Sequence, residues 1–150
     1  MSLAYIGLGS NLGDKEFNLR NSIEQLNLHA GKVLQSSSFY VSAPLGFKSE
    51  NMFLNAVVLL ETSFTPLKLL RTTQNIEKLL GRKTKKTRSY EDRIIDIDIL
   101  LYDQLILNHP KLTIPHPHIA ERDFVIRPLT EIATGLIHPA TGKLIIESLK

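Results

Sequence analysis

The chain has 150 residues, a net charge of +3, 43% hydrophobic residues and 22% charged residues. This length fits one domain over residues 1–150, and the composition is that of an ordinary globular protein with a buried core. The chain has no cysteine, which excludes a disulfide framework and a thiolate metal site. It also lacks a basic leader segment and any apolar run near the ~20 residues that span a bilayer, so we expect a cytoplasmic protein with no membrane partner.

The first part of the chain predicts a strand, a helix and a second strand. Residues 3–8 are apolar and predict a buried strand, and residues 9–14 hold the Gly, Ser, Asn and Asp typical of a turn. Apolar residues three and four apart predict a helix over residues 15–29, with Asp14 as its N-cap. Residues 33–42 predict the second strand.

The middle of the chain predicts a loop, a strand and a second helix. Residues 43–52 contain Pro and Gly and predict a loop. Residues 54–62 are rich in Val and Leu and predict a strand. Thr65 and Pro66 fit the cap and the first position of a helix that extends to about Leu80.

The last part predicts a strand over residues 94–102, a turn into a short partner strand at 105–108, and a helix around 125–134. The order β-α-β-β-α-β is that of the ferredoxin-like split βαβ arrangement. This is an α+β fold, in which helices cover one face of an antiparallel sheet. Because such a fold supports many functions, the function must be inferred from the site.

Two aspartates, Asp96 and Asp98, interrupt the apolar strand predicted at 94–102. They share one face because side chains alternate along a strand, and their alpha carbons would lie about 6.6 Å apart. Burying two like charges without partners is costly, so something must compensate. Salt bridges, for example from Arg93, are one possibility, a general acid–base pair is another, and paired oxygen ligands for Mg²⁺ are a third. The same alternation predicts two sets of neighbours: Ile95, Ile97, Ile99 and Leu101 on the core face, and Ile94, Leu100 and Tyr102 beside the aspartates.

A basic segment precedes this strand. Taken alone, it is typical of a solvated loop. Next to a carboxylate pair, it fits a magnesium nucleotide, with the metal on bridging oxygens and the cations on the remaining phosphate charge. The chain has neither a GxxxxGK[ST] loop nor a protein-kinase glycine loop, so side chains and metal must hold the phosphates. The cations are Arg82, Lys83, Lys85, Lys86, Arg88 and Arg93.

A series of short motifs extends from residue 5 to residue 142. The most specific is Arg93-x-x-Asp96-x-Asp98, followed by Pro115-His116. The stretches are 5–14, 37–40 with 44–46, 53–56, 74–77, 81–82, 93–98, 114–116, and 122–124 with 128–133. In this order they resemble the 6-hydroxymethyl-7,8-dihydropterin pyrophosphokinase family of folate biosynthesis.

The resemblance implies a monomeric, ATP-dependent diphosphokinase. Its partners would be ATP and 6-hydroxymethyl-7,8-dihydropterin, its products AMP and the pterin diphosphate, and its cofactor two Mg²⁺ ions. Two alternatives stay open, a catalytically impaired relative and a ferredoxin-like module that binds nucleic acid. The second is disfavoured because the RNA-recognition signature is absent and central carboxylates would repel a phosphate backbone.

The resemblance also implies roles for individual residues. The catalytic positions are Arg82, Arg93, Asp96 and Asp98, with both aspartates as metal ligands. The ATP-binding positions are Gln74, Glu77, Arg82, Arg93, Ile99, Lys111, Thr113, His116 and Arg122. The pterin-binding positions are Ser42, Ala43, Leu45, Phe53, Asn55, Tyr90 and Phe124. Several of these have simpler explanations: Glu77 as part of a solvated helix face, His116 as a turn histidine, and Phe53 and Phe124 as core residues.

One departure from the family pattern lies next to the acidic strand. Glu91 and Asp92 stand where the family often has Gly-Pro before the arginine. The resemblance implies that these two negative charges weaken the positive field around the phosphates.

Overall fold

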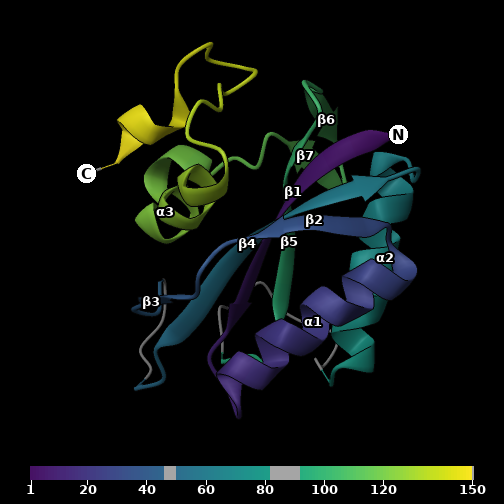
Figure 1. Cartoon of the computed structure of the whole chain (residues 1–150), viewed down its shortest axis with the longest axis vertical. Helices are drawn as coiled ribbons and strands as arrows, with labels where there is room; N and C mark the ends of the chain where they lie inside the picture. Colours follow the sequence, from purple (N-terminus) through teal and green to yellow (C-terminus); the bar gives the residue numbers. More distant parts are fainter. Residues whose placement is uncertain (46–49, 82–91, 150) are drawn as a thin grey trace.

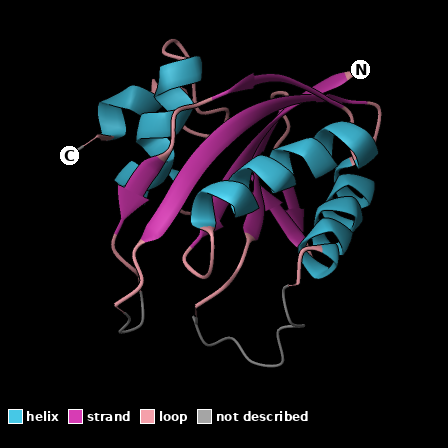
Figure 2. Cartoon of the chain, turned by 60° about the horizontal axis from the view of Figure 1, so that its bottom comes forward, coloured by secondary structure: helices cyan, strands magenta, loops and turns pink. Residues whose placement is uncertain are grey.

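The structure is a computed structural model that describes residues 1–45, 50–81 and 92–149 (Figures 1 and 2). Within these residues, five strands form one antiparallel sheet, in the order β2-β4-β1-β5, with β3 also paired to β4. No helix among them is long and apolar enough to cross a membrane. The strands of this sheet are β1 (Ser2–Ser10), β2 (Lys32–Ser36), β3 (Tyr40–Ser42), β4 (Phe53–Thr62) and β5 (Asp96–Tyr102).

Helices α1 (Lys15–His29) and α2 (Pro66–Leu79) pack together against one face of the sheet (Figure 1). Each begins at the predicted cap. The Asp14 side chain accepts a hydrogen bond from the N–H of Phe17, and the Thr65 hydroxyl accepts one from the N–H of Lys68. The split βαβ prediction is confirmed for this part of the chain.

The opposite face of the sheet is partly covered as well. Helix α3 (Asp123–Ile132), which contains Pro128, lies there with a short 3₁₀ segment at Ile145–Ser148 (Figure 1). A second apolar cluster lies beneath them, so the expectation of helices on one face alone was incomplete. The fully buried members of this cluster are Val57, Leu100, Leu101, Ile119, Ile126, Leu129 and Ile145.

Two predicted strands differ from the structure. The strand expected at 33–42 is divided into β2 and β3. Between them, the backbone N–H of Val57 in β4 donates to the Ser37 hydroxyl at 2.9 Å, and not to a backbone carbonyl of a paired strand. The strand expected at 105–108 does not pair with β5. Instead, β6 (Leu107–His109) pairs with β7 (Leu112–Ile114) in a separate hairpin.

The predicted alternation of side chains between the two sheet faces is wrong at the C-terminal end of β5, because the strand contains a bulge there. Ile6 of β1 lies opposite Ile99, but Tyr5 lies opposite Leu101, so Leu100 is an extra residue. Leu101 therefore joins the cluster under α3, and Tyr102 packs toward α1 and α2. The bulge lies beyond the two aspartates, which keep the face that was predicted for them.

Candidate active site

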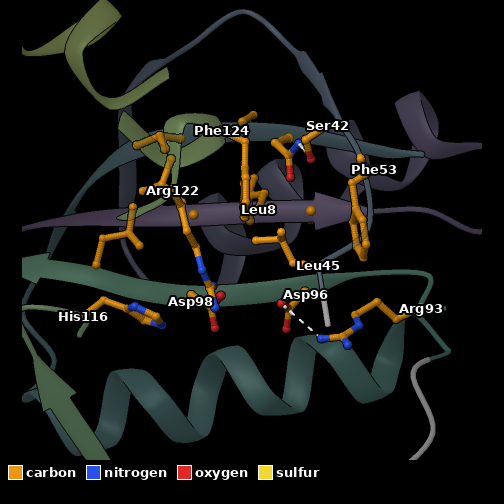
Figure 3. A pocket seen from close by; sticks show the side chains of 18 residues that line it. Leu8, Ser42, Leu45, Phe53, Arg93, Asp96, Asp98, His116, Arg122 and Phe124 are labelled. Carbon is orange, nitrogen blue, oxygen red and sulfur yellow. Dashed lines mark hydrogen bonds and ion pairs between the residues drawn. The ribbon is translucent and has the colours of Figure 1, made fainter. Parts of the chain in front are cut away.

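A pocket opens on the sheet face that carries α3 (Figure 3). Side chains from β1, β4 and β5 meet there with residues after β3, after β7 and at the start of α3. The predicted site residues that line this pocket are Ser42, Ala43, Leu45, Phe53, Asn55, Arg93, Asp96, Asp98, His116, Arg122 and Phe124. Positions far apart in the sequence are thus brought into one cavity.

The floor of the pocket is formed by two glycines of β1 that had no predicted role. Gly7 lies opposite Asp98 and Gly9 lies opposite Asp96, on the same face of the sheet. A Cβ at Gly9 would lie 3.3 Å from Oδ1 of Asn55, so a side chain here would crowd the pocket. The signal in the sequence was a pair of glycines two residues apart in a strand, which marks a close approach of another group.

Asp96 and Asp98 project from β5 into the pocket (Figure 3). Nη1 of Arg93 lies 3.4 Å from Oδ2 of Asp96, and the Arg93 side chain is only 7% exposed. The proposed salt bridge from Arg93 therefore exists and compensates part of the acidic charge. Because Arg93 is buried, its charge is less screened by solvent than that of a surface arginine.

The two aspartates fit a hard cation such as Mg²⁺. They present carboxylate oxygens on one strand face, which is the donor type that Mg²⁺ prefers. Within residues 1–45, 50–81 and 92–149, no group of three or more His, Cys, Asp or Glu residues could hold a metal. A cation held by these two carboxylates would therefore take its other ligands from water and a substrate, as Mg²⁺ commonly does with phosphates.

His116 presents a neutral ring to the pocket. Burial lowers the pKa of His116 from its ordinary 6.5 to about 4, assisted by the charges of Arg122 and His118 and opposed by Asp96. Nδ1 accepts the backbone N–H of His118 at 3.2 Å, so the neutral ring carries its proton on Nε2. His116 is thus an ordered turn residue whose neutral ring carries one N–H donor, on Nε2.

The β4 side of the pocket combines an aromatic ring with a buried amide, and a second ring comes from α3. Figure 3 shows Phe53 and Phe124 standing apart on two sides of the cavity. Nδ2 of Asn55, a residue only 5% exposed, donates to the carbonyl oxygen of Tyr40 at 3.0 Å and to Oγ of Ser42 at 2.8 Å. These bonds fix the amide so that Oδ1 lies beside Gly9, on the pocket side. A flat, polar heterocycle fits between such groups.

Arg122 extends into the same cavity from the start of α3 (Figure 3). Its guanidinium carbon lies 5.8 Å from the centre of the Phe124 ring. With Arg93, this residue gives the pocket two cations in addition to its two carboxylates.

Among the residues that the structure describes, the remaining predicted positions do not line this pocket. Ile99 is buried on the opposite face of β5, so only its backbone is available to a ligand. Oε2 of Glu77 accepts a hydrogen bond from the backbone N–H of Ile97 at 2.9 Å. This N–H lies in β5, the strand at the edge of the sheet. Gln74, Lys111 and Thr113 are exposed on α2 and on the β6–β7 hairpin. Arg82 and Tyr90 lie outside the described residues. The roles suggested for all of these positions stay predictions.

The antiparallel α+β fold, the carboxylate pair beside a buried arginine, and the aromatic rings of the pocket define a class: a phosphate-transferring enzyme. Comparison with known proteins identifies the family. The family model described as 7,8-dihydro-6-hydroxymethylpterin-pyrophosphokinase (HPPK) matches residues 5–134, and the chain belongs to this family. The resemblance found in the sequence is therefore confirmed.

Individual relatives cover most of the chain. It is 45% identical over 141 residues to the 2-amino-4-hydroxy-6-hydroxymethyldihydropteridine pyrophosphokinase of Porphyromonas gingivalis, covering 93% of this chain and 95% of that protein. It is 41% identical over 151 residues to the enzyme of the same name from Haemophilus influenzae, covering 100% and 92%. It is 44% identical over 138 residues to the folic acid synthesis protein fol1 of Pneumocystis carinii, covering 92% of this chain but only 18% of that longer protein.

The fold is also that of solved relatives. The crystal structure of wild-type Plasmodium falciparum HPPK-DHPS with pteroate matches with a TM-score of 0.79 at 16% identity, covering 98% of this chain and 41% of that chain. At this identity the match establishes the α+β fold alone.

Proposed function

We propose that the chain transfers the pyrophosphoryl group of ATP to the hydroxymethyl oxygen of 6-hydroxymethyl-7,8-dihydropterin, within folate biosynthesis. The observation that carries this proposal is the arrangement of the pocket. Asp96, Asp98 and Arg93 lie at its β5 side, and Asn55 and Phe53 lie at its β4 side, with β1 between the two strands. A single cavity therefore offers one end suited to phosphate and another suited to a flat heterocycle.

The phosphate end would bind ATP together with two Mg²⁺ ions. Asp96 and Asp98 would hold the metal, whose chemistry is to neutralise phosphate charge and to orient the phosphate chain. Arg93 lies beside this pair and would stabilise the negative charge that spreads over the transferred group. His116 would donate from Nε2 to an oxygen or nitrogen of the nucleotide.

The heterocycle end would hold the acceptor. The Asn55 amide, fixed by Tyr40 and Ser42, would hydrogen-bond the polar edge of the pterin, while aromatic rings contact its flat faces. Such positioning brings the hydroxymethyl oxygen to the β-phosphorus of ATP. The new bond joins these two atoms, the hydroxyl proton is lost to solvent, the bond from the β-phosphorus to the bridging oxygen of the α-phosphate breaks, and AMP leaves.

The other expected positions would belong to the same two binding regions. Gln74, Glu77, Arg82, Ile99, Lys111, Thr113 and Arg122 would contact ATP, and Ser42, Ala43, Leu45, Tyr90 and Phe124 would contact the pterin. We also propose that the protein acts as a monomer in the cytoplasm, without a nucleic-acid partner.

The direct test is an omission experiment with the purified protein. AMP should form when ATP, Mg²⁺ and 6-hydroxymethyl-7,8-dihydropterin are all present, and not when any one is left out. Release of ADP in place of AMP would contradict transfer of a pyrophosphoryl group. No nucleotide product from the folded protein would identify it as a catalytically impaired relative.

A further inference from the structure

Three chain segments are joined by hydrogen bonds at the phosphate end of the pocket: the residue after β1, the approach to β4, and the approach to β5. Nδ2 of Asn11 donates to Oδ1 of Asp92 at 2.8 Å, and Nδ2 of Asn51 donates to Oδ2 of Asp92 at 3.0 Å. Both carboxylate oxygens of Asp92 therefore accept a side-chain amide. We call Asn11, Asn51 and Asp92 the Asp92 clasp.

The clasp holds the backbone of Arg93. The N–H of Arg93 donates to Oδ1 of Asn11 at 2.7 Å, and the N–H of Asn11 donates to the carbonyl oxygen of Arg93 at 3.1 Å. Asn11 is only 2% exposed, so its amide cannot exchange these partners for water at low cost. Because Asp92 accepts from Nδ2, it also fixes Oδ1 of Asn11 toward the N–H of Arg93.

The same clasp connects the two ends of the pocket. Asn51 lies two residues before Phe53, at the heterocycle end, and Asp92 directly precedes Arg93, at the phosphate end. The carbonyl oxygen of Asn51 also accepts Nδ2 of Asn11 at 3.3 Å. These hydrogen bonds thus link the segment that leads to Phe53 with the segment that leads to Arg93.

We propose that Asp92 is a positioning residue, which holds the Arg93 guanidinium beside Asp96 and sets it relative to the segment that carries Phe53. This inference rests on the proposed function for the role of Arg93. It differs from the expectation that the Asp92 charge merely weakens the field at the phosphates. Positioning depends on the hydrogen bonds of Asp92, whereas a field effect depends on its charge.

Two substitutions separate these effects. Asp92→Ala removes both acceptors and should lower kcat by about tenfold or more, because small misplacements of catalytic groups are costly. Asp92→Asn removes the charge but keeps an acceptor for Asn11, and its amide group can donate to Asn51 after the Asn51 amide turns over. This conservative variant should therefore keep most of the wild-type rate. Glu50→Gln is the matched control, because it removes an exposed charge nearby and should leave the rate unchanged.

Equal losses in Asp92→Ala and Asp92→Asn would show that the charge matters and not the hydrogen bonds, and would overturn the inference. Faster turnover or a lower KM for ATP in both variants would support the field effect instead. Wild-type kcat in Asp92→Ala would also contradict positioning.

The kcat of a double variant tests whether Asp92 acts through Arg93, which a merely structural residue would not do. In an Arg93→Ala background, Asp92→Ala should cause almost no further loss of kcat, because the group that it positions is gone. If Asp92→Ala slows the Arg93→Ala enzyme as much as it slows the wild type, Asp92 does not act through Arg93.

A measurement that does not depend on catalysis tests the clasp separately from the proposed function. Hydrogen exchange of the Arg93 amide should be at least about tenfold faster in Asp92→Ala than in wild type, and close to wild type in Asp92→Asn. Unchanged exchange in Asp92→Ala would overturn the clasp. If the wild type releases no AMP but exchange behaves as expected, the clasp stands and the proposed function fails.

Discussion

Asp96 and Asp98 lie on one face of β5, so the strand itself fixes the separation of the two carboxylates. This feature could be predicted from the sequence, because alternation along a strand depends only on local geometry. The ion pair of Asp96 with Arg93 was one of three ways, all left open by the sequence, in which the two carboxylate charges could be compensated. The partners of Asp92 could not be predicted, since Asn11 and Asn51 are distant in the sequence and meet only in the folded chain.

Asp98→Asn tests the metal assignment. Turnover should fall by at least about a hundredfold, because a ligand for the ion that stabilises phosphate charge becomes neutral. The melting temperature should stay at or above that of the wild type, since one of two repelling charges is removed. Steady-state kinetics and thermal unfolding check both expectations, and wild-type turnover would refute the assignment.

His116 predicts a pH dependence of stability in the metal-free protein. Its pKa is lowered in the folded state from 6.5 to about 4, so the folded state favours the neutral ring. The resulting contribution to stability is complete above pH 6.5 and is lost as the pH falls from there toward 4. At pH 5 the loss is up to about 2 kcal/mol.

Denaturant unfolding of wild type and His116→Gln at pH 5 and pH 8 measures this contribution. The wild type should lose more stability than the variant between pH 8 and pH 5. An equal loss in both proteins would show that His116 does not titrate as described.

At the scale of elements, the bulge in β5 and the glycines of β1 show where local patterns were insufficient. The extra residue Leu100 moves Leu101 to the face under α3, and no pattern of apolar residues distinguishes this from regular alternation. Gly9 was assigned to a turn because it begins the run of Gly, Ser, Asn and Asp over residues 9–14. In the folded sheet it is the floor of the pocket, which becomes evident only when Asn55 is placed opposite it.

Gly9→Ala should weaken binding of the heterocycle. The added Cβ would lie 3.3 Å from Oδ1 of Asn55 and 3.6 Å from Cδ1 of Phe53. We expect KM for the pterin to rise by about tenfold, which corresponds to ~1.4 kcal/mol, with a smaller effect on KM for ATP. Gly135→Ala is the matched control, because a Cβ there would meet no atom within 4 Å. Equal kinetic effects of the two substitutions would contradict this role of Gly9.

For the whole molecule, the order of strands and helices along the chain followed from periodicity, caps and turn residues, and that order implied two helices on one face of the sheet. The contribution of α3 to the opposite face did not follow, because the sequence does not show which face a C-terminal helix covers. This helix completes the pocket, since Arg122 and Phe124 lie at its start. The site therefore depends on contacts between the first and last parts of the chain.

We propose that one pocket brings ATP and a hydroxymethyl pterin together for pyrophosphoryl transfer. The most direct measurement is phosphorus NMR of the products formed by the wild type and by Asp96→Asn from ATP, Mg²⁺ and 6-hydroxymethyl-7,8-dihydropterin. We expect equal amounts of AMP and pterin diphosphate from the wild type, and neither from the variant. ADP with a pterin monophosphate, or equal product formation by both proteins, would contradict it.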